Sequence, residues 1–156
     1  MHDWVFVSGN PDQQDTDWHC ESNDPTYFSD LSYTTVGADG AEIIGYLNIS
    51  DTQAILKADN RADTTIYFRG YNITDTGVTF PLRRGATGAG AVAKRAFAYL
   101  LDDPLFLSRT GVFSLTTNNI TAMQAVRNRS FYVERVLCAL CQLALLYLGR
   151  QPERRI

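Results

Sequence analysis

The sequence predicts a mixed α/β domain, because segments with strand-like composition alternate with segments of helical composition. Residues 27–50 and 64–73 are rich in β-branched and aromatic side chains, which favour strands. Residues 83–103 pass from a Gly-rich loop into an Ala- and Leu-rich segment, which favours a helix. Residues 110–128 then indicate a strand followed by a short helix. The sequence therefore predicts strands first, then a strand–loop–helix unit and a strand–helix–strand unit.

The N-terminal half is expected to contain a loop, a hairpin and one further strand. Residues 1–26 are rich in Asp, Asn, Gln and Pro, and are typical of a loop after a short apolar opening. Residues 27–50 predict a β-hairpin, because an Asp-Gly pair at 39–40 between two β-prone runs suits a tight turn with positive φ. Residues 51–63 are interpreted as a polar connection to the strand at 64–73.

The C-terminal half is expected to alternate between helices and strands. A Thr-Asp-Thr-Gly turn at 74–77 leads into a short run at 78–82, and Pro104 ends the first helix. Asn118 or Asn119 caps the second helix. The predicted ranges are a helix in the second part of 83–103, a strand at 110–117, a helix at 120–128, a strand at 131–137 and a strand, or alternatively a helix, at 142–149.

Size and charge limit the classes of protein to consider. The 156 residues suit one domain over 1–156, in which 1–40 is the atypical part, and 45% hydrophobic residues allow a real core. The net charge of −3 argues against a broad nucleic-acid surface, so no nucleic-acid partner is expected. The longest apolar stretch, residues 136–149, is shorter than the roughly 18 residues of a membrane span. We expect no membrane partner and a cytoplasmic location.

The three cysteines, Cys20, Cys138 and Cys141, do not suggest a disulfide framework, because their number is odd. Cys138 and Cys141 have CxxC spacing, but they lie in an apolar run with no second pair and no nearby His. Two small buried apolar side chains are the favoured interpretation, and a metal or redox role is the alternative. We therefore expect no metal site.

The Gly-rich segment at 81–97 is the first candidate for chemistry. Unpaired backbone N–H groups at a helix N-terminus, together with the helix dipole, favour phosphate, and glycines allow its close approach. Arg83 and Arg84 add charge that suits phosphate oxygens. The segment is neither a Walker A motif nor a complete GxGxxG fingerprint. A simple turn is the alternative interpretation.

The order of several motifs resembles the GNAT superfamily of N-acetyltransferases over roughly residues 32–148. The hairpin at 36–49 is similar to the family's second and third strands, and Thr79-Phe80-Pro81 resembles its Val-x-Pro phrase. Residues 83–92 resemble its pyrophosphate loop, and Asn119 with Ala122 resembles its Asn-x-x-Ala motif. The tail is also similar, since Ser130-Phe131 stands at the Gly-Phe position, followed by Glu134 and Leu137.

The resemblance implies a GNAT-like fold, a mixed and mostly antiparallel sheet with helices on both faces. It is closest to the ribosomal-protein N-terminal acetyltransferase branch. The implied activity is transfer of an acetyl group from acetyl-CoA, as co-substrate, to the amine of a protein N-terminus or small molecule. The resemblance leaves open whether the protein forms a homodimer. The residues implied in cofactor binding are Phe80, Arg83, Arg84, Gly85, Ala86, Thr87, Gly88, Ala89, Gly90 and Asn119.

The catalytic residues are not assigned by the resemblance. The positions where the family usually has its general acid hold Arg127 and Ala122. The weak candidates for catalysis are Asp75, Glu134 and Tyr132, with Asp63 as a further possible base and Tyr99 as a further possible acid.

Two alternative functions remain open. The first is a catalytically impaired GNAT-fold protein that serves as a CoA-binding or protein-interaction module. The second is a secreted or viral glycoprotein domain, because Asn-x-Ser/Thr occurs four times. Those four asparagines are otherwise interpreted as caps and turns: Asn48, Asn72, Asn119 and Asn128.

Overall fold

A computed structural model shows that the chain is all-β over its described residues, which contain antiparallel sheets and no helix. The predicted α/β class, with GNAT-like helices on both faces of one sheet, is therefore wrong. The described residues are 4–38, 40–49, 52–59, 64–74, 77–101, 103–115 and 126–128.

The N-terminal sheet has the order β1-β2-β3, formed by β1 (Phe6–Asn10), β2 (Gln13–His19) and β3 (Tyr33–Thr35). The backbone N–H of Asp12 donates to Asn10 Oδ1 at 3.1 Å in the turn between β1 and β2. The loop predicted after the short apolar opening of 1–26 is wrong, because β2, although polar in composition, pairs with β1 and β3 and buries Asp17 against the central sheet. Burial here outweighs strand propensity.

The central sheet has the order β4-β5-β6-β9, formed by β4 (Ile43–Ile49), β5 (Thr52–Lys57), β6 (Ile66–Arg69) and β9 (Leu82–Arg84). The predicted hairpin over 27–50 is wrong, because β3 pairs with β2 while β4 pairs with β5. The predicted polar connection is largely strand β5, which is buried without interruption from Gln53 to Lys57.

A long arm extends from the central sheet. The strand predicted at 64–73 is confirmed in two pieces, β6 and β7 (Asn72–Thr74), and β7 pairs with β8 (Gly77–Thr79). Gly70 N–H donates to the Pro81 carbonyl at 3.1 Å, so the arm continues the β6–β9 ladder. Phe80 then packs edge-on against the rings of Trp4 and Phe6, with centroids 5.0 and 5.2 Å apart.

The C-terminal sheet has the order β10-β11-β12-β13, formed by β10 (Phe97–Leu100), β11 (Asp103–Ser108), β12 (Gly111–Leu115) and β13 (Val126–Asn128). The strand predicted at 110–117 is confirmed by β12. The helix predicted in 83–103 is wrong, because its end forms β10 and Pro104 pairs with Tyr99 inside the sheet. The helix predicted at 120–128 is wrong for 126–128, which pair with β12.

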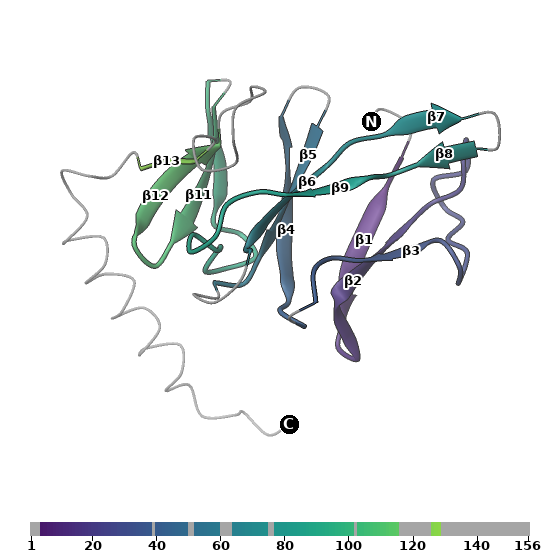
Figure 1. The fold of residues 1–156 in the computed structure, drawn as a ribbon, viewed down its shortest axis with the longest axis horizontal. Helices are drawn as coiled ribbons and strands as arrows, with labels where there is room; N and C mark the ends of the chain where they lie inside the picture. The colour runs from purple at the N-terminus through teal and green to yellow at the C-terminus, as the bar shows by residue number, and fades with distance from the viewer. Residues whose placement is uncertain are drawn as a thin grey trace, which may run out of the picture.

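The three sheets stack in a row, with β1–β3 at one end, β10–β13 at the other and the central sheet between them (Figure 1). One face of the central sheet packs toward β1–β3, where Ile43, Ile55 and Tyr67 form a buried cluster with Val36, the residue after β3. The other face packs toward the C-terminal sheet through a larger cluster that includes Phe106. This double coverage explains the continuous burial of β5.

Some predictions fall on residues outside the described part of the chain: the strand at 131–137, the element at 142–149, and the pair Cys138 and Cys141. Cys20 is buried, and its Sγ accepts a hydrogen bond from the Val5 N–H at 3.1 Å. In the described part of the chain, no helix has the length and apolarity needed to span a membrane.

Candidate functional site

The Gly-rich loop is part of the packed interior and does not precede a helix. Ala86 and Ala89 are 7% exposed, and a Cβ at Gly90 would lie 2.3 Å from Asp59 Cα. Its backbone groups are also engaged: Gly85 N–H donates to the Ile66 carbonyl at 2.8 Å. Ala91 N–H donates to the Lys57 carbonyl at 3.1 Å. The feature expected to bind a pyrophosphate, a row of open amides at a helix start, is absent from this segment.

The remaining predicted cofactor residues do not converge on one site. Arg83 and Arg84 lie in β9 opposite Phe68 and Tyr67, so their side chains point to opposite faces of the sheet. Thr87 and Gly88 are exposed at the loop's surface, while Phe80 lies in the arm against the N-terminal sheet. Five predicted site residues lie outside the described part of the chain: Asp63, Asp75, Asn119, Tyr132 and Glu134.

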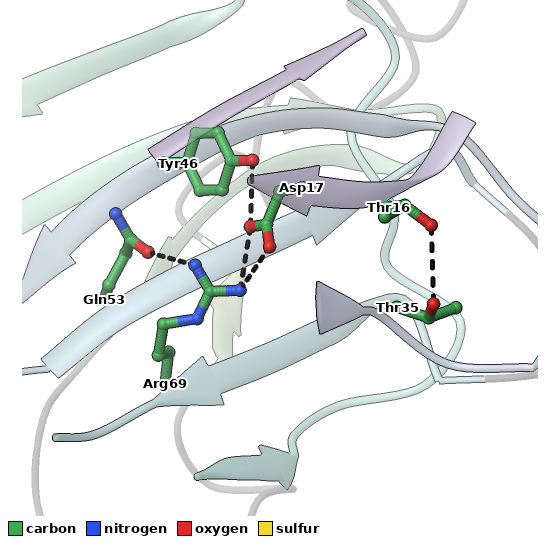
Figure 2. Close-up of polar contacts among 6 residues, drawn as sticks. All are labelled: Thr16, Asp17, Thr35, Tyr46, Gln53 and Arg69. Carbon is green, nitrogen blue, oxygen red and sulfur yellow. Dashed lines mark hydrogen bonds and ion pairs between the residues drawn. The ribbon is translucent and has the colours of Figure 1, made fainter. Parts of the chain in front are cut away.

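A buried polar network joins the N-terminal and central sheets (Figure 2). Arg69 Nη2 on β6 donates to both carboxylate oxygens of Asp17 on β2, at 2.7 Å each, and the two side chains are 0% and 1% exposed. Arg69 Nη1 also donates to Gln53 Oε1 at 3.2 Å. The guanidinium lies over the Phe6 ring, 4.2 Å from its centroid. Because both charged groups are buried, their ion pair fixes β2 of one sheet against β6 of the other.

Tyr46 on β4 connects the network to the surface. Its hydroxyl donates to Asp17 Oδ2 at 3.1 Å and is hydrogen-bonded to Ser8 on β1. Burial, and next the negative charge of Asp17, raise the pKa of the Tyr46 hydroxyl, so it stays protonated as a donor. Burial also raises the pKa of the Asp17 carboxyl, and the Arg69 charge and hydrogen bonds, which lower it, offset this only in part.

A groove of about 310 Å³ lies above this network, between the first strands of two sheets. The residues that line it come from β1, from β4 and from the segment before β10: Phe6, Val7, Ser8, Gly9, Ile43, Ile44, Gly45, Tyr46 and Lys94. At its rim, Lys94 Nζ forms an ion pair with Glu42 at 2.5 Å. Both β1 and β4 are edge strands of their sheets, so the groove separates two strand edges.

The outward edge of β4 presents backbone groups to this groove. Residues of an antiparallel edge strand alternately turn their N–H and C=O toward and away from the neighbouring strand, so Tyr46 and Asn48, two positions apart, both turn theirs away from β5. For Asn48 the contacts confirm this direction, because its N–H donates to Tyr99 Oη at 3.1 Å and its carbonyl accepts from that hydroxyl at 3.3 Å. Tyr99 therefore caps Asn48, and the edge at Tyr46 faces the groove.

We predict that Tyr99→Phe will uncap the edge at Asn48 while leaving the sheet folded. Tyr99 is 55% exposed, so removing its hydroxyl opens no cavity in the core. A hydrogen bond worth about 1 kcal/mol corresponds to about fivefold faster exchange of the Asn48 amide. Hydrogen–deuterium exchange read by NMR measures this, with the ladder amide of Leu47 as the internal control. Equal acceleration at both amides would instead mean that the strand itself is loosened.

The residues of this groove were not identified from the sequence. Phe6 falls in the short apolar opening, for which no strand was predicted, and Ser8 falls in the segment predicted to be a loop. Tyr46 falls in a hairpin whose pairing was predicted wrongly. The Trp-Val-Phe-Val run at 4–7, followed by the Asn-Pro-Asp turn at 10–12, was the signal that could have identified β1.

The described residues contain no group of three or more His, Cys, Asp or Glu side chains that could hold a metal. No protein-family model, curated protein or solved structure matches the chain.

Proposed function

We propose that the protein is a non-catalytic interaction module that binds an extended polypeptide segment in the groove between β1 and β4. The observation that carries this proposal is the outward-facing backbone of β4 at Tyr46, beside a second strand edge. An extended peptide would add a strand to such an edge through main-chain hydrogen bonds.

The lining of the groove suits a peptide backbone. Gly9 presents no side chain, and nothing lies within 4 Å of the place a Cβ would take there, so a strand can approach β1 closely. Phe6 and Ile44 offer apolar contact area, and Ser8 adds a hydroxyl. A volume of about 310 Å³ lies at the lower end of ordinary ligand sites, which suits a few residues of a strand.

Acetyl transfer and acetyl-CoA binding stay untested predictions, as does a cytoplasmic location. Both functions were predicted from a helix after the Gly-rich loop and from cofactor-binding residues that lie close together. The described part of the chain has no such helix, and its predicted cofactor-binding residues lie apart. The protein-interaction role, by contrast, was one of the alternatives and requires no cofactor. This role agrees with the polar network of Asp17 and Arg69, which is buried and holds strands of two sheets in position.

We predict that a peptide bound here will use only one of its two edges. Peptides of about ten residues, the upper length of an ordinary strand, can be selected for binding from a displayed random library. In a synthetic copy, N-methylation of one alternate set of amides should weaken binding at least about tenfold, because it removes donors that face β4. Calorimetric titration of the full chain measures the effect.

The control is N-methylation of the other alternate amides, which face away from β4 and should leave affinity nearly unchanged. Equal losses from both sets, or failure of any selected peptide to bind the full chain, would contradict strand addition.

A further inference from the structure

Tyr99 occupies part of the β4 edge that an added strand would use. Its hydroxyl accepts a hydrogen bond from the Asn48 N–H at 3.1 Å and donates one to the Asn48 carbonyl at 3.3 Å. In an antiparallel ladder, the two residues of a bonded pair exchange the same two hydrogen bonds through their backbones. One side-chain hydroxyl therefore does at Asn48 what a residue of a neighbouring strand would do.

The position of Tyr99 limits how far a strand on β4 can extend. The outward-facing residues Tyr46 and Asn48 are two positions apart, so a strand paired with both would bond them in succession. The edge at Tyr46 faces the groove, whereas at Asn48 the hydroxyl of Tyr99 is in place. On the other side of Tyr46, the register of β4 shifts between Ile43 and Gly45, which interrupts the regular alternation. A bound segment therefore has one regular bonded position, at Tyr46, unless Tyr99 moves.

The surroundings of Tyr99 allow its side chain to move without disturbing the core. The base of β10 is fixed, because the Phe97 ring packs so closely on Gly45 that a Cβ there would lie 2.7 Å away. The outer part of β10 is open to solvent: Tyr99 is 55% exposed, and Leu100 and Leu101 are 61% and 92% exposed. Tyr99 belongs to neither buried apolar cluster of the described residues. Turning its side chain outward therefore breaks the two hydrogen bonds to β4 and leaves the core intact.

We propose that Tyr99 is the gate of the peptide groove: it limits the length of the segment that pairs with β4, and it turns outward when a longer segment continues past Tyr46 to Asn48. This inference rests on the proposed peptide binding and adds the residue that limits it. A short extended segment pairs at Tyr46 with Tyr99 in place. A longer segment gains two hydrogen bonds at Asn48 but displaces the two that Tyr99 makes there, so the additional length contributes little affinity.

The test compares a selected peptide of about ten residues with copies shortened stepwise from either end. In the wild-type chain, shortening the end that lies over Asn48 should leave the dissociation constant nearly unchanged. Tyr99→Ala should bind the uncut peptide about tenfold more tightly than the wild type does, because two hydrogen bonds form at Asn48 and none is broken. Shortening that same end should remove the gain. Calorimetric titration of the full chain measures all four affinities, which form a double-mutant cycle between Tyr99 and the peptide end.

Tyr33→Ala is the matched control, because Tyr33 is also about half-exposed, at 54%, and lies on β3 away from the groove. It should leave the affinities for all the peptides unchanged, and circular dichroism establishes that both variants are folded. Amide hydrogen exchange gives a second readout. When the uncut peptide binds Tyr99→Ala, the Asn48 amide, which has lost its bond to Tyr99, should become protected together with the Tyr46 amide.

The outcomes separate the gate from the peptide site itself. Equal affinities of the wild type and Tyr99→Ala for the uncut peptide, with Tyr46 protected in both, would overturn the gate and leave peptide binding in place. A gain that survives shortening at both ends would also overturn it, because the gain would not then arise at Asn48. Failure of every peptide to protect Tyr46 in the wild type would contradict the proposed function, and the gate with it.

Discussion

Asp17→Ala is expected to lower the free energy of unfolding by about 3–5 kcal/mol, because it leaves the Arg69 guanidinium buried without its partner. Arg69 is 0% exposed and gives both Nη2 hydrogen bonds to Asp17. The hydroxyl of Tyr46 loses its acceptor in the same variant. Urea denaturation followed by tryptophan fluorescence measures the loss, since Trp4 and Trp18 both lie in the N-terminal sheet region.

Two further variants separate lost pairing from lost packing. Asp17→Leu combined with Arg69→Met removes both charges and should recover most of the stability, because well-packed apolar replacements of buried ion pairs are often neutral. Asp30→Ala, at an exposed position, should leave the stability nearly unchanged. If Asp17→Ala were as mild as Asp30→Ala, the network would not join the two sheets.

Gly90→Ala is expected to cost about 3 kcal/mol, at the upper end of overpacking effects. The added Cβ would lie 2.3 Å from Asp59 Cα and 2.6 Å from Asp59 N, which are backbone atoms that cannot rotate away. The loop must therefore shift from the core cluster that contains Ala89 and Ala91. Thermal or urea unfolding measures this cost.

Gly70→Ala is the matched control, because its Cβ would meet only Pro81 Cγ, at an ordinary 3.9 Å. It should change the stability little, or raise it slightly through the unfolded state. A Gly-rich loop that opens to a phosphate would give the opposite pattern, with Gly90→Ala harmless to folding. Equal stability of the two variants would show that the loop is not packed as the structure has it.

Local composition predicted the strands whose residues are unambiguously β-prone. Residues 64–73 and 110–117 combine β-branched and aromatic side chains, and both form strands. The turn at 74–77 is also confirmed, because Thr74 pairs with Gly77 where β7 meets β8. The conformation of these elements is set by residues that lie close together in the chain, so the local sequence is enough to predict them.

Elements defined by the tertiary environment were not predictable in the same way. The Ala- and Leu-rich segment before Pro104 has high helix propensity, yet Phe97 packs so closely on Gly45 that a Cβ there would lie 2.7 Å from its ring. Packing of that kind overrides propensity. Strand β5 is buried on both faces and lacks the alternation that marks a half-exposed strand.

The candidate site was beyond prediction for a related reason. Asp17 and Arg69 are separated by 52 positions, and no local pattern indicates that they pair. The groove depends on β1 and β4 belonging to different sheets, whereas the sequence favoured pairing within 27–50. The resemblance to acetyltransferases arose from short motifs in a suitable order, and such motifs occur in strands and turns as readily as around a cofactor.

Amide hydrogen exchange on β4, with and without a selected peptide, decides whether this edge is a binding site. If an extended segment pairs with β4 in the groove, the Tyr46 amide becomes strongly protected on binding. The Asn48 amide, already bonded to Tyr99, changes little. Protection elsewhere in the chain with Tyr46 unchanged would contradict the proposed function.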